Sequence, residues 1–351
     1  MSTVFEDNPD LGGFAAPQFL PVAEAFIKNF RERDEIGACV TVIHQGQTVA
    51  DLWMGHQNPA KTVPWDAQTL LPVFSNTKVA TALCLHKLVD EGKVDLDAPV
   101  ATYWPEFAAK GKGAVPVSSL LNHSAGLPAV RQPLPHASFR DWEFMTQTLA
   151  AEEPFWEPGT TNGYHMASFG WLVGEVVRRV SGMSLGAYFD QHFRQPTQAE
   201  FYIGLPRSEC HRFAPVLLKR PSLITVLGHP FLRRVVLNRN SIPSLSLINS
   251  GRFSPNKPIY WPAHIGGGGG IGNARGMANL YRPLAENDGT LLSQAAVDRL
   301  RSPSMETRND LNLGLPTRFS LGAMLRMDNG GEASRGSSLL IPNGAFGHTG
   351  I

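Results

Sequence analysis

The stretch PVFSNTKVATA, residues 72–82, carries the most informative spacing in the chain, because Ser75 and Lys78 stand three residues apart. The apolar residues that follow predict a helix from about Ser75 to the EGK of residues 91–93. Side chains at positions i and i+3 of a helix share one face, so Oγ of Ser75 and Nζ of Lys78 can meet. A serine hydroxyl needs a base to become a nucleophile, and a lysine serves if burial lowers its pKa. The spacing therefore predicts a nucleophilic serine, although an SxxK pattern alone also occurs by chance.

The residues before this stretch predict a helix followed by an antiparallel hairpin. Residues 17–33 place apolar side chains at helical spacing. Residues 38–43 and 48–54 are rich in β-branched side chains, and the HQGQ between them is typical of a tight turn. We therefore expect one helix packed on an antiparallel sheet.

The residues after this stretch predict a helical middle and a return to strands. From about 95 to 250 the chain shows helical patches and long loops with Pro and Gly. The six glycines within 266–272 predict a tight turn near the site. A further helix is expected at 274–285, and strands are expected at 319–326 and 337–341.

Together these elements predict an α/β protein of the α+β kind, with one catalytic domain over residues 1–351. Residues 1–70 and 260–351 are expected to build one mixed, mainly antiparallel sheet flanked by helices. Residues 71–259 are expected to form a mostly helical inserted region. The active site should lie in the groove between the two parts.

A second serine motif, GMSLG at 182–186, matches the GxSxG nucleophile elbow of α/β-hydrolases. That elbow needs a strand before it and a sharp turn into a helix. An apolar helical pattern over residues 173–180 precedes it instead. We therefore expect Ser184 to cap a helix rather than to act as a nucleophile.

Further blocks accompany the SxxK stretch in a fixed order along the chain. They are SLLNHSAGLP at 119–128, EPGTTNGYHMASFGWLVGEVVRRVSG at 157–182, GGGIGNARGMANLYRPLAENDGTLLS at 268–293, and FGHTGI at 346–351. With residues 72–82, these blocks resemble the motifs of the serine β-lactamase and penicillin-binding superfamily, including class C β-lactamases, DD-peptidases and family VIII carboxylesterases. The resemblance runs from about residue 15 to the last residue. It implies a β-lactamase/DD-peptidase-like fold and acyl-enzyme chemistry, with no metal and no cofactor.

The same resemblance implies a role for each matching residue. Ser75 would be the acyl-accepting nucleophile, and Lys78 would share or relay its proton. Tyr164 would take the Ser75 proton and later activate water. The backbone N–H groups of Ser75 and Ile351 would form the oxyanion hole. The expected substrate pocket is lined by His165, His348, Thr349, Gly350 and Trp261.

Two departures from the family motifs bear on the substrate. YHM replaces the YSN or YAN of β-lactamases, so Met166 lacks the carboxamide that would hold a β-lactam amide. HTG replaces KTG, so a permanent cation becomes His348, which is mostly neutral at pH 7. Both changes favour a carboxylesterase for small or short-chain acyl esters. A transacylase or amidase, or a weak β-lactamase, remains the alternative within the same fold.

A third departure concerns the end of the sequence. Family members normally continue through two more strands and a C-terminal helix after the HTG segment, and these are expected to be absent here. An α-carboxylate at Ile351 would oppose charge on the oxyanion, so we expect impaired activity from the 351-residue chain. A non-catalytic binding protein is the alternative from another functional class.

Composition limits the partners. The formal net charge is +1 and 42% of residues are hydrophobic, which predicts a folded protein without a nucleic-acid or membrane partner. Neither a signal peptide nor a run of about 18 apolar residues is found. The three separated cysteines do not form a disulfide framework. We therefore expect a cytoplasmic enzyme acting on a small-molecule ester, with its oligomeric state left open.

Overall fold

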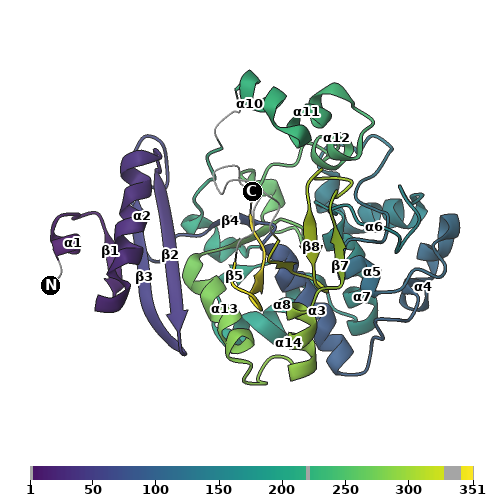
Figure 1. The fold of residues 1–351 in the computed structure, drawn as a ribbon, viewed down its shortest axis with the longest axis horizontal. Coiled ribbons are helices and arrows are strands. Elements are labelled where there is room, and N and C mark those ends of the chain that lie inside the picture. The colour runs from purple at the N-terminus through teal and green to yellow at the C-terminus, as the bar shows by residue number, and fades with distance from the viewer. Residues whose placement is uncertain (1–2, 219–221, 328–340, 351) are drawn as a thin grey trace.

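The structure, a computed structural model, describes residues 3–218, 222–327 and 341–350. Its N-terminal part is a layer of three antiparallel strands in the order β1-β3-β2, covered on one face by helix α2 (Leu20–Glu32) (Figure 1). The strands are β1 (Gly12–Ala15), β2 (Gly37–His44) and β3 (Gln47–Gly55). Helix and sheet bury a small apolar cluster of Leu11, Ala23, Phe26, Ile27 and Leu52. The predicted helix and hairpin are confirmed.

The remaining described strands form two more antiparallel sheets. The order of one sheet is β4-β6-β5, and that of the other is β10-β9-β8-β7. Their strands are β4 (Leu71–Phe74), β5 (Phe201–Tyr202), β6 (Gly270–Gly272), β7 (Met305–Thr307), β8 (Thr317–Phe319), β9 (Met324–Leu325) and β10 (Phe346–Gly347). The segment expected to be extended at 319–326 is a short hairpin: β8 ends at Phe319, residues 320–323 form a turn, and β9 covers Met324–Leu325. Of the strand expected at 337–341, residues 337–340 lie outside the described residues.

The prediction of one mixed sheet shared by the two ends of the chain is wrong for the described residues. Strand β2 is the edge of the N-terminal sheet, and helix α13 contacts it on that side of the molecule. Strand β10 pairs with β9 instead. Among the described residues, the two ends of the chain therefore contribute to separate sheets.

Helices fill most of the remainder. They are α1 (Thr3–Glu6), α3 (Thr77–Asp90), α4 (Val100–Tyr103), α5 (Ser118–Leu121), α6 (Trp142–Ala151), α7 (Phe169–Ser181), α8 (Leu185–Phe189), α9 (Gln195–Thr197), α10 (Leu223–Gly228), α11 (Pro230–Leu237), α12 (Ile242–Leu247), α13 (Ala274–Glu286) and α14 (Gln294–Arg301). Short 3-10 or π turns lie at Pro17–Phe19, Pro105–Gly111, Ser138–Arg140, Asp190–Arg194, Arg207–Arg212 and Pro258–Tyr260. Among the described residues, no helix combines the length and the apolar character needed to cross a membrane.

Helix α3 lies at the centre of the main apolar core. Its residues from Thr77 to His86 are all buried, and it packs against α7 and α8. A helix that is buried on every side does not need an amphipathic pattern, and α3 buries Thr77, Lys78, Thr81 and His86 together with its apolar residues. Lys78 lies in the first turn of this helix and is fully buried with it.

Candidate active site

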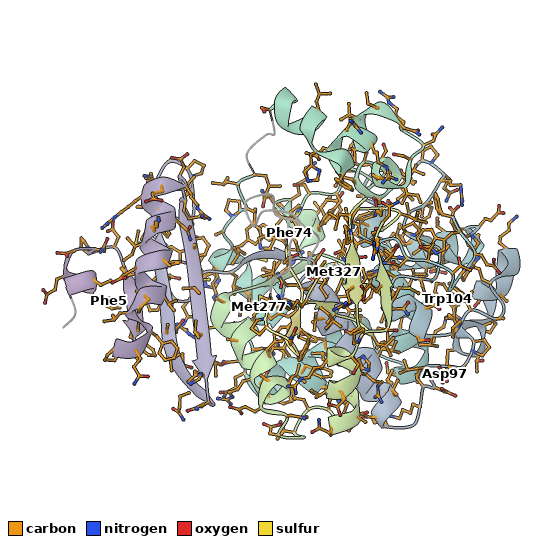
Figure 2. The ribbon with its side chains drawn as sticks, in the orientation of Figure 1. Phe5, Phe74, Asp97, Trp104, Met277 and Met327 are labelled. Atoms are coloured by element: carbon orange, nitrogen blue, oxygen red, sulfur yellow. The ribbon has the colours of Figure 1, made fainter. Side chains whose placement is uncertain are left out.

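The turn from β4 into α3 sets the position of Ser75. Phe74, near the centre of the view in Figure 2, has φ of 48°, in the left-handed region that a phenylalanine rarely adopts. Its carbonyl accepts a hydrogen bond from Oγ1 of Thr77 at 2.5 Å, and the same Oγ1 accepts one from the N–H of Gly270 at 2.9 Å. Such backbone strain persists only where neighbours hold it. These bonds fix the sharp turn that presents Ser75 at the start of the helix.

The predicted triad of Ser75, Lys78 and Tyr164 comes together around one oxygen atom. The hydroxyl of Tyr164 donates a hydrogen bond to Oγ of Ser75 at 2.7 Å. Nζ of Lys78 lies 3.1 Å from the same Oγ and 4.7 Å from the centre of the Tyr164 ring. Ser75 is 9% exposed, whereas Lys78 is fully buried. A nucleophile within reach of two proton-transferring groups is the arrangement that acyl transfer requires.

Lys78 has no carboxylate partner among the described residues. Nζ donates to the backbone carbonyls of Met166 at 2.7 Å and Gly267 at 2.5 Å, and Ser75 Oγ is its third polar neighbour. Burial without a counter-ion lowers the pKa of Lys78 well below its ordinary value. A neutral amine has two hydrogens for the two carbonyls and one lone pair for the Ser75 hydroxyl. The contacts therefore suit a neutral Lys78 that can take the Ser75 proton.

The glycine cluster allows the chain to approach Lys78 closely. A Cβ on Gly170 of helix α7 would lie 2.1 Å from the backbone nitrogen of Gly267. The carbonyl of Gly266 accepts a hydrogen bond from Oγ1 of Thr81 at 2.9 Å, one turn after Lys78 on α3. The predicted turn near the site is confirmed, and its glycines admit α7 against the loop that binds Lys78.

Tyr164 is fixed through its backbone by a buried carboxylate. Both oxygens of Asp310 accept a hydrogen bond from the N–H of Tyr164, each at 3.0 Å. Nδ2 of Asn312 donates to the Tyr164 carbonyl at 2.7 Å. Burial raises the pKa of Tyr164 above its ordinary value, and the Asp310 charge adds to that rise, although the hydrogen bond to Ser75 opposes it. The phenol is therefore neutral. Taking the Ser75 proton would require a lowered pKa of Tyr164, and burial raises that pKa instead.

The HTG segment borders the site. Nε2 of His348 lies 3.3 Å from the Tyr164 hydroxyl, and Nδ1 of His348 donates to the carbonyl of Thr349 at 2.7 Å. Burial, the largest cause, lowers the pKa of His348 to about 3. Thr349 and Gly350 are exposed, and a Cβ on Gly350 would lie 3.3 Å from the carbonyl oxygen of Val73. The segment thus lies beside the turn that carries Ser75.

One half of the expected oxyanion hole falls within the described residues. The N–H of Ser75 donates to no acceptor within the described part of the chain, which leaves it available to a developing oxyanion. The second expected donor, Ile351, lies outside the described residues.

The expectation that His165 lines the substrate pocket is wrong. Its side chain is fully buried, Nδ1 donates to the Gly163 carbonyl at 2.7 Å, and Nε2 accepts from the N–H of Leu127 at 3.0 Å. Burial lowers the pKa of His165 to about 3, so the ring is neutral. Both ring nitrogens thus form hydrogen bonds that join the loop around Gly163 to the loop around Leu127.

Trp261 contacts the loop that precedes the glycine cluster. Its ring packs on Phe213 with centroids 4.1 Å apart, and its N–H donates to the Pro255 carbonyl at 3.0 Å. It belongs to a satellite apolar cluster with Leu70 and Leu205. The indole thus takes part in packing the loop before the glycines, and its assignment to the acyl pocket stays a prediction.

Ser184 lies where the helix-cap interpretation predicts. It precedes α8, and its Oγ accepts a hydrogen bond from the N–H of Ala187 at 3.4 Å. The GxSxG match is therefore a helix junction. Phe74, Asp310 and Asn312 were missed by the sequence analysis. The φ value of Phe74 has no sequence motif, and Asp310 and Asn312 lie 146 and 148 positions from Tyr164, so local spacing does not connect them with the site.

Comparisons with known proteins agree with this geometry. The sequence matches the profile of the Beta-lactamase family over residues 23–351. It is 32% identical over 329 residues to the esterase/beta-lactamase LipL of Mycobacterium tuberculosis, covering 90% of this chain and 76% of that protein.

Solved structures show the same relationship. A family VIII carboxylesterase superposes with a TM-score of 0.80 at 37% identity, covering 97% of this chain and 87% of that one. A penicillin-binding protein homologue from Caulobacter crescentus superposes with a TM-score of 0.80 at 29% identity, covering 97% and 88%. The fold is thus that of the β-lactamase-like serine enzymes, and this chain belongs to the Beta-lactamase family.

Proposed function

We propose that the protein is a serine hydrolase that cleaves small or short-chain carboxylic esters through an acyl-enzyme on Ser75. The observation that carries the proposal is the position of Ser75 Oγ, 3.1 Å from Nζ of Lys78 and 2.7 Å from the Tyr164 hydroxyl. Two relatives described as esterases, LipL and EstB of Burkholderia gladioli, and the family VIII carboxylesterase support this chemistry.

Acylation begins with proton transfer from Ser75 to neutral Lys78. As Oγ of Ser75 forms a bond to the ester carbonyl carbon, the carbonyl oxygen gains negative charge and accepts a hydrogen bond from the N–H of Ser75. When the C–O bond to the alcohol breaks, the leaving oxygen needs a proton. The neutral Tyr164 hydroxyl supplies it, and the Lys78 ammonium returns the proton to Tyr164.

Deacylation uses the same groups with water in place of the alcohol. A water molecule attacks the acyl carbon and transfers a proton to Lys78, while Oγ of Ser75 leaves and regains a proton. The free acid is released and the site returns to its starting protonation state. An alcohol or amine in place of water would give transacylation or aminolysis with the same balance of protons.

Two features favour neutral esters over β-lactams. The neutral His348 offers no permanent cation for a substrate carboxylate, and Met166 contributes a backbone carbonyl to Lys78 rather than a carboxamide to the substrate. We therefore expect β-lactam hydrolysis to be slow. The cytoplasmic location expected from the sequence stays a prediction.

The proposal is tested by intact-mass measurement after incubation with a fluorophosphonate. Attack by Ser75 forms an Oγ–P bond and expels fluoride, with the serine proton leaving as hydrogen fluoride. We expect one adduct on the wild-type protein and none on Ser75→Ala. Ser184→Ala is the matched control, since it removes the other motif serine and should leave labelling intact. Labelling that persists in Ser75→Ala would contradict the proposal.

A further inference from the structure

Charge is distributed unevenly along the chain. The complete sequence has 30 acidic residues, yet none of them lies between Glu209 and Glu286. The same interval contains the basic residues Arg212, Lys219, Arg220, Arg233, Arg234, Arg239, Arg252, Lys257, Arg275 and Arg282. The net charge of +1 therefore averages a strongly basic segment with an acidic remainder.

Exposed apolar side chains gather in the same interval. Of the nine large hydrophobic side chains that are exposed among the described residues, seven belong to it. They are Leu217, Leu218, Leu227, Val236, Leu237, Ile248 and Ile259. Leu237 is 71% exposed and Ile248 is 65% exposed. Single exposed hydrophobic residues are ordinary, but their concentration in a segment without acidic residues marks an interaction surface.

Part of this interval forms a helical cap, which we define as residues 223–248 with helices α10, α11 and α12. Figure 1 shows the cap along the upper margin of the molecule, beyond β7 and β8. The cap is held against the rest of the chain by packing and hydrogen bonds. Val235 is buried, and Nη2 of Arg234 donates to the Leu311 carbonyl at 2.9 Å. Oγ of Ser246 donates to Oδ1 of Asn312 at 3.0 Å. These contacts fix the position of the cap, and with it the position of its exposed side chains.

The cap borders a groove of about 590 Å³ that is also lined by Arg131 and Pro133. Arg131 is ion-paired with Glu152, whereas Arg239 contributes a guanidinium from the cap itself. Val236, Leu245 and Ile248 line the apolar wall of the groove. The side chains of Arg233 and Arg239 are exposed, and within the described part of the chain neither forms an ion pair. The cap thus combines aliphatic side chains with guanidinium groups that have no intramolecular counter-ion.

We propose that the helical cap docks on the surface of an anionic lipid bilayer. Aliphatic side chains with adjacent arginines are the composition of segments that lie in the membrane interface, where the apolar groups enter the acyl boundary and the cations meet lipid phosphates. A nucleic acid is a poorer match, because the exposed hydrophobic side chains of the cap include no aromatic ring on which a base could stack.

The low net charge of the whole chain does not oppose this docking. Salt screens charges beyond a Debye length of about 8 Å under physiological conditions, so a bound surface senses the arginines of the cap more than acidic residues far from it. Glu152 lies near the groove, but its charge is balanced by Arg131. The expectation of no membrane partner follows from the average charge of the whole chain, whereas the cap carries a local excess of positive charge. The proposal concerns binding and is independent of the chemistry assigned to Ser75.

The test is co-sedimentation of the complete protein with two kinds of vesicle, phosphatidylcholine alone and phosphatidylcholine with phosphatidylglycerol. We expect binding to the anionic vesicles only, weakened by added salt. Arg233→Glu combined with Arg239→Glu should lower the partition coefficient about tenfold or more. Leu237→Gln combined with Ile248→Gln should also lower it, because apolar insertion is lost.

Control variants place comparable changes outside the cap. Arg33→Glu with Arg308→Glu alters net charge equally at two exposed positions outside the cap, and Phe14→Gln removes an exposed apolar side chain from the N-terminal sheet. Both should bind like wild type. The proposal is overturned if the wild-type protein does not bind anionic vesicles, or if the control variants lose as much binding as the cap variants. It is also overturned if the protein binds duplex DNA or polyglutamate but not the vesicles. Circular dichroism checks folding, and fluorophosphonate labelling separately reports Ser75.

Discussion

Tyr164 donates its hydroxyl hydrogen to Oγ of Ser75 over 2.7 Å, and this bond places a proton donor beside the nucleophile. Removing the hydroxyl with Tyr164→Phe should lower kcat for ester hydrolysis by about 10²- to 10⁴-fold, the usual contribution of a general acid or base. Steady-state kinetics on a chromogenic ester measures the effect.

The control for this substitution is Tyr281→Phe. The Tyr281 hydroxyl is buried and has no hydrogen-bond partner within the described residues, so its removal should leave kcat unchanged and stability equal or higher. Equal rates for Tyr164→Phe and wild type would show that Tyr164 transfers no proton in the slow step.

Lys78 makes stability depend on pH. Burial lowers its pKa, so between that lowered value and the ordinary value of 10.5 the unfolded chain binds a proton that the folded site does not. Stability therefore rises with pH through this window. Lys78→Met should abolish esterase activity and flatten the rise, measured by urea denaturation at several pH values. Lys28→Met removes an exposed lysine and controls for the lost charge. Parallel pH curves for wild type and Lys78→Met would mean that folded Lys78 stays charged.

Asp310 supports Tyr164 rather than the substrate. Asp310→Asn replaces one acceptor oxygen by a donor that faces the backbone N–H groups of Tyr164, Asn312 and Leu313. We expect the free energy of unfolding to fall by about 2–4 kcal/mol. At temperatures where the variant is folded, kcat should also fall while Ser75 still reacts with a fluorophosphonate. Asp10→Asn, at an exposed position, is the control. Unchanged kcat in folded Asp310→Asn would remove the positioning role.

His348 sets the charge next to Tyr164. With its pKa lowered to about 3, the ring stays neutral across the assay range, so the wild-type rate should show no inflection near pH 6.5 from this residue. His348→Lys introduces a permanent cation and should raise the ratio of kcat/KM for a carboxylate-bearing β-lactam over that for a neutral ester about tenfold. His136→Lys, an exposed position, should leave the ratio unchanged, and an unchanged ratio in His348→Lys would show that this position does not select substrate charge.

The parts of the site that depend on local spacing were predictable. Ser75 and Lys78 lie in one helical turn, so their proximity follows from the helix repeat. Tyr164 is 89 positions from Ser75 and could be placed only through the resemblance to known motifs. The helix and hairpin at the N-terminus follow from side-chain periodicity, which is a local property.

The parts that depend on long-range packing were not predictable. His165 and Trp261 stand close in sequence to functional residues, yet each points into a buried or satellite cluster. A neighbour in sequence does not fix the direction of a side chain within a loop. The separation into three sheets likewise depends on which strands pair across the chain, and alternating patterns do not encode that choice.

Asn312 receives a hydrogen bond from Ser246 of the cap and gives one to the carbonyl of Tyr164. The sequences of related enzymes should therefore vary together at these two positions. A cap with a different sequence must keep a hydrogen-bond donor at position 246, or residue 312 must change with it. Cap exchange between relatives should succeed more often when residues 310–312 are transferred together with the cap. The residue pair 246 and 312 is thus a natural boundary for building chimaeras.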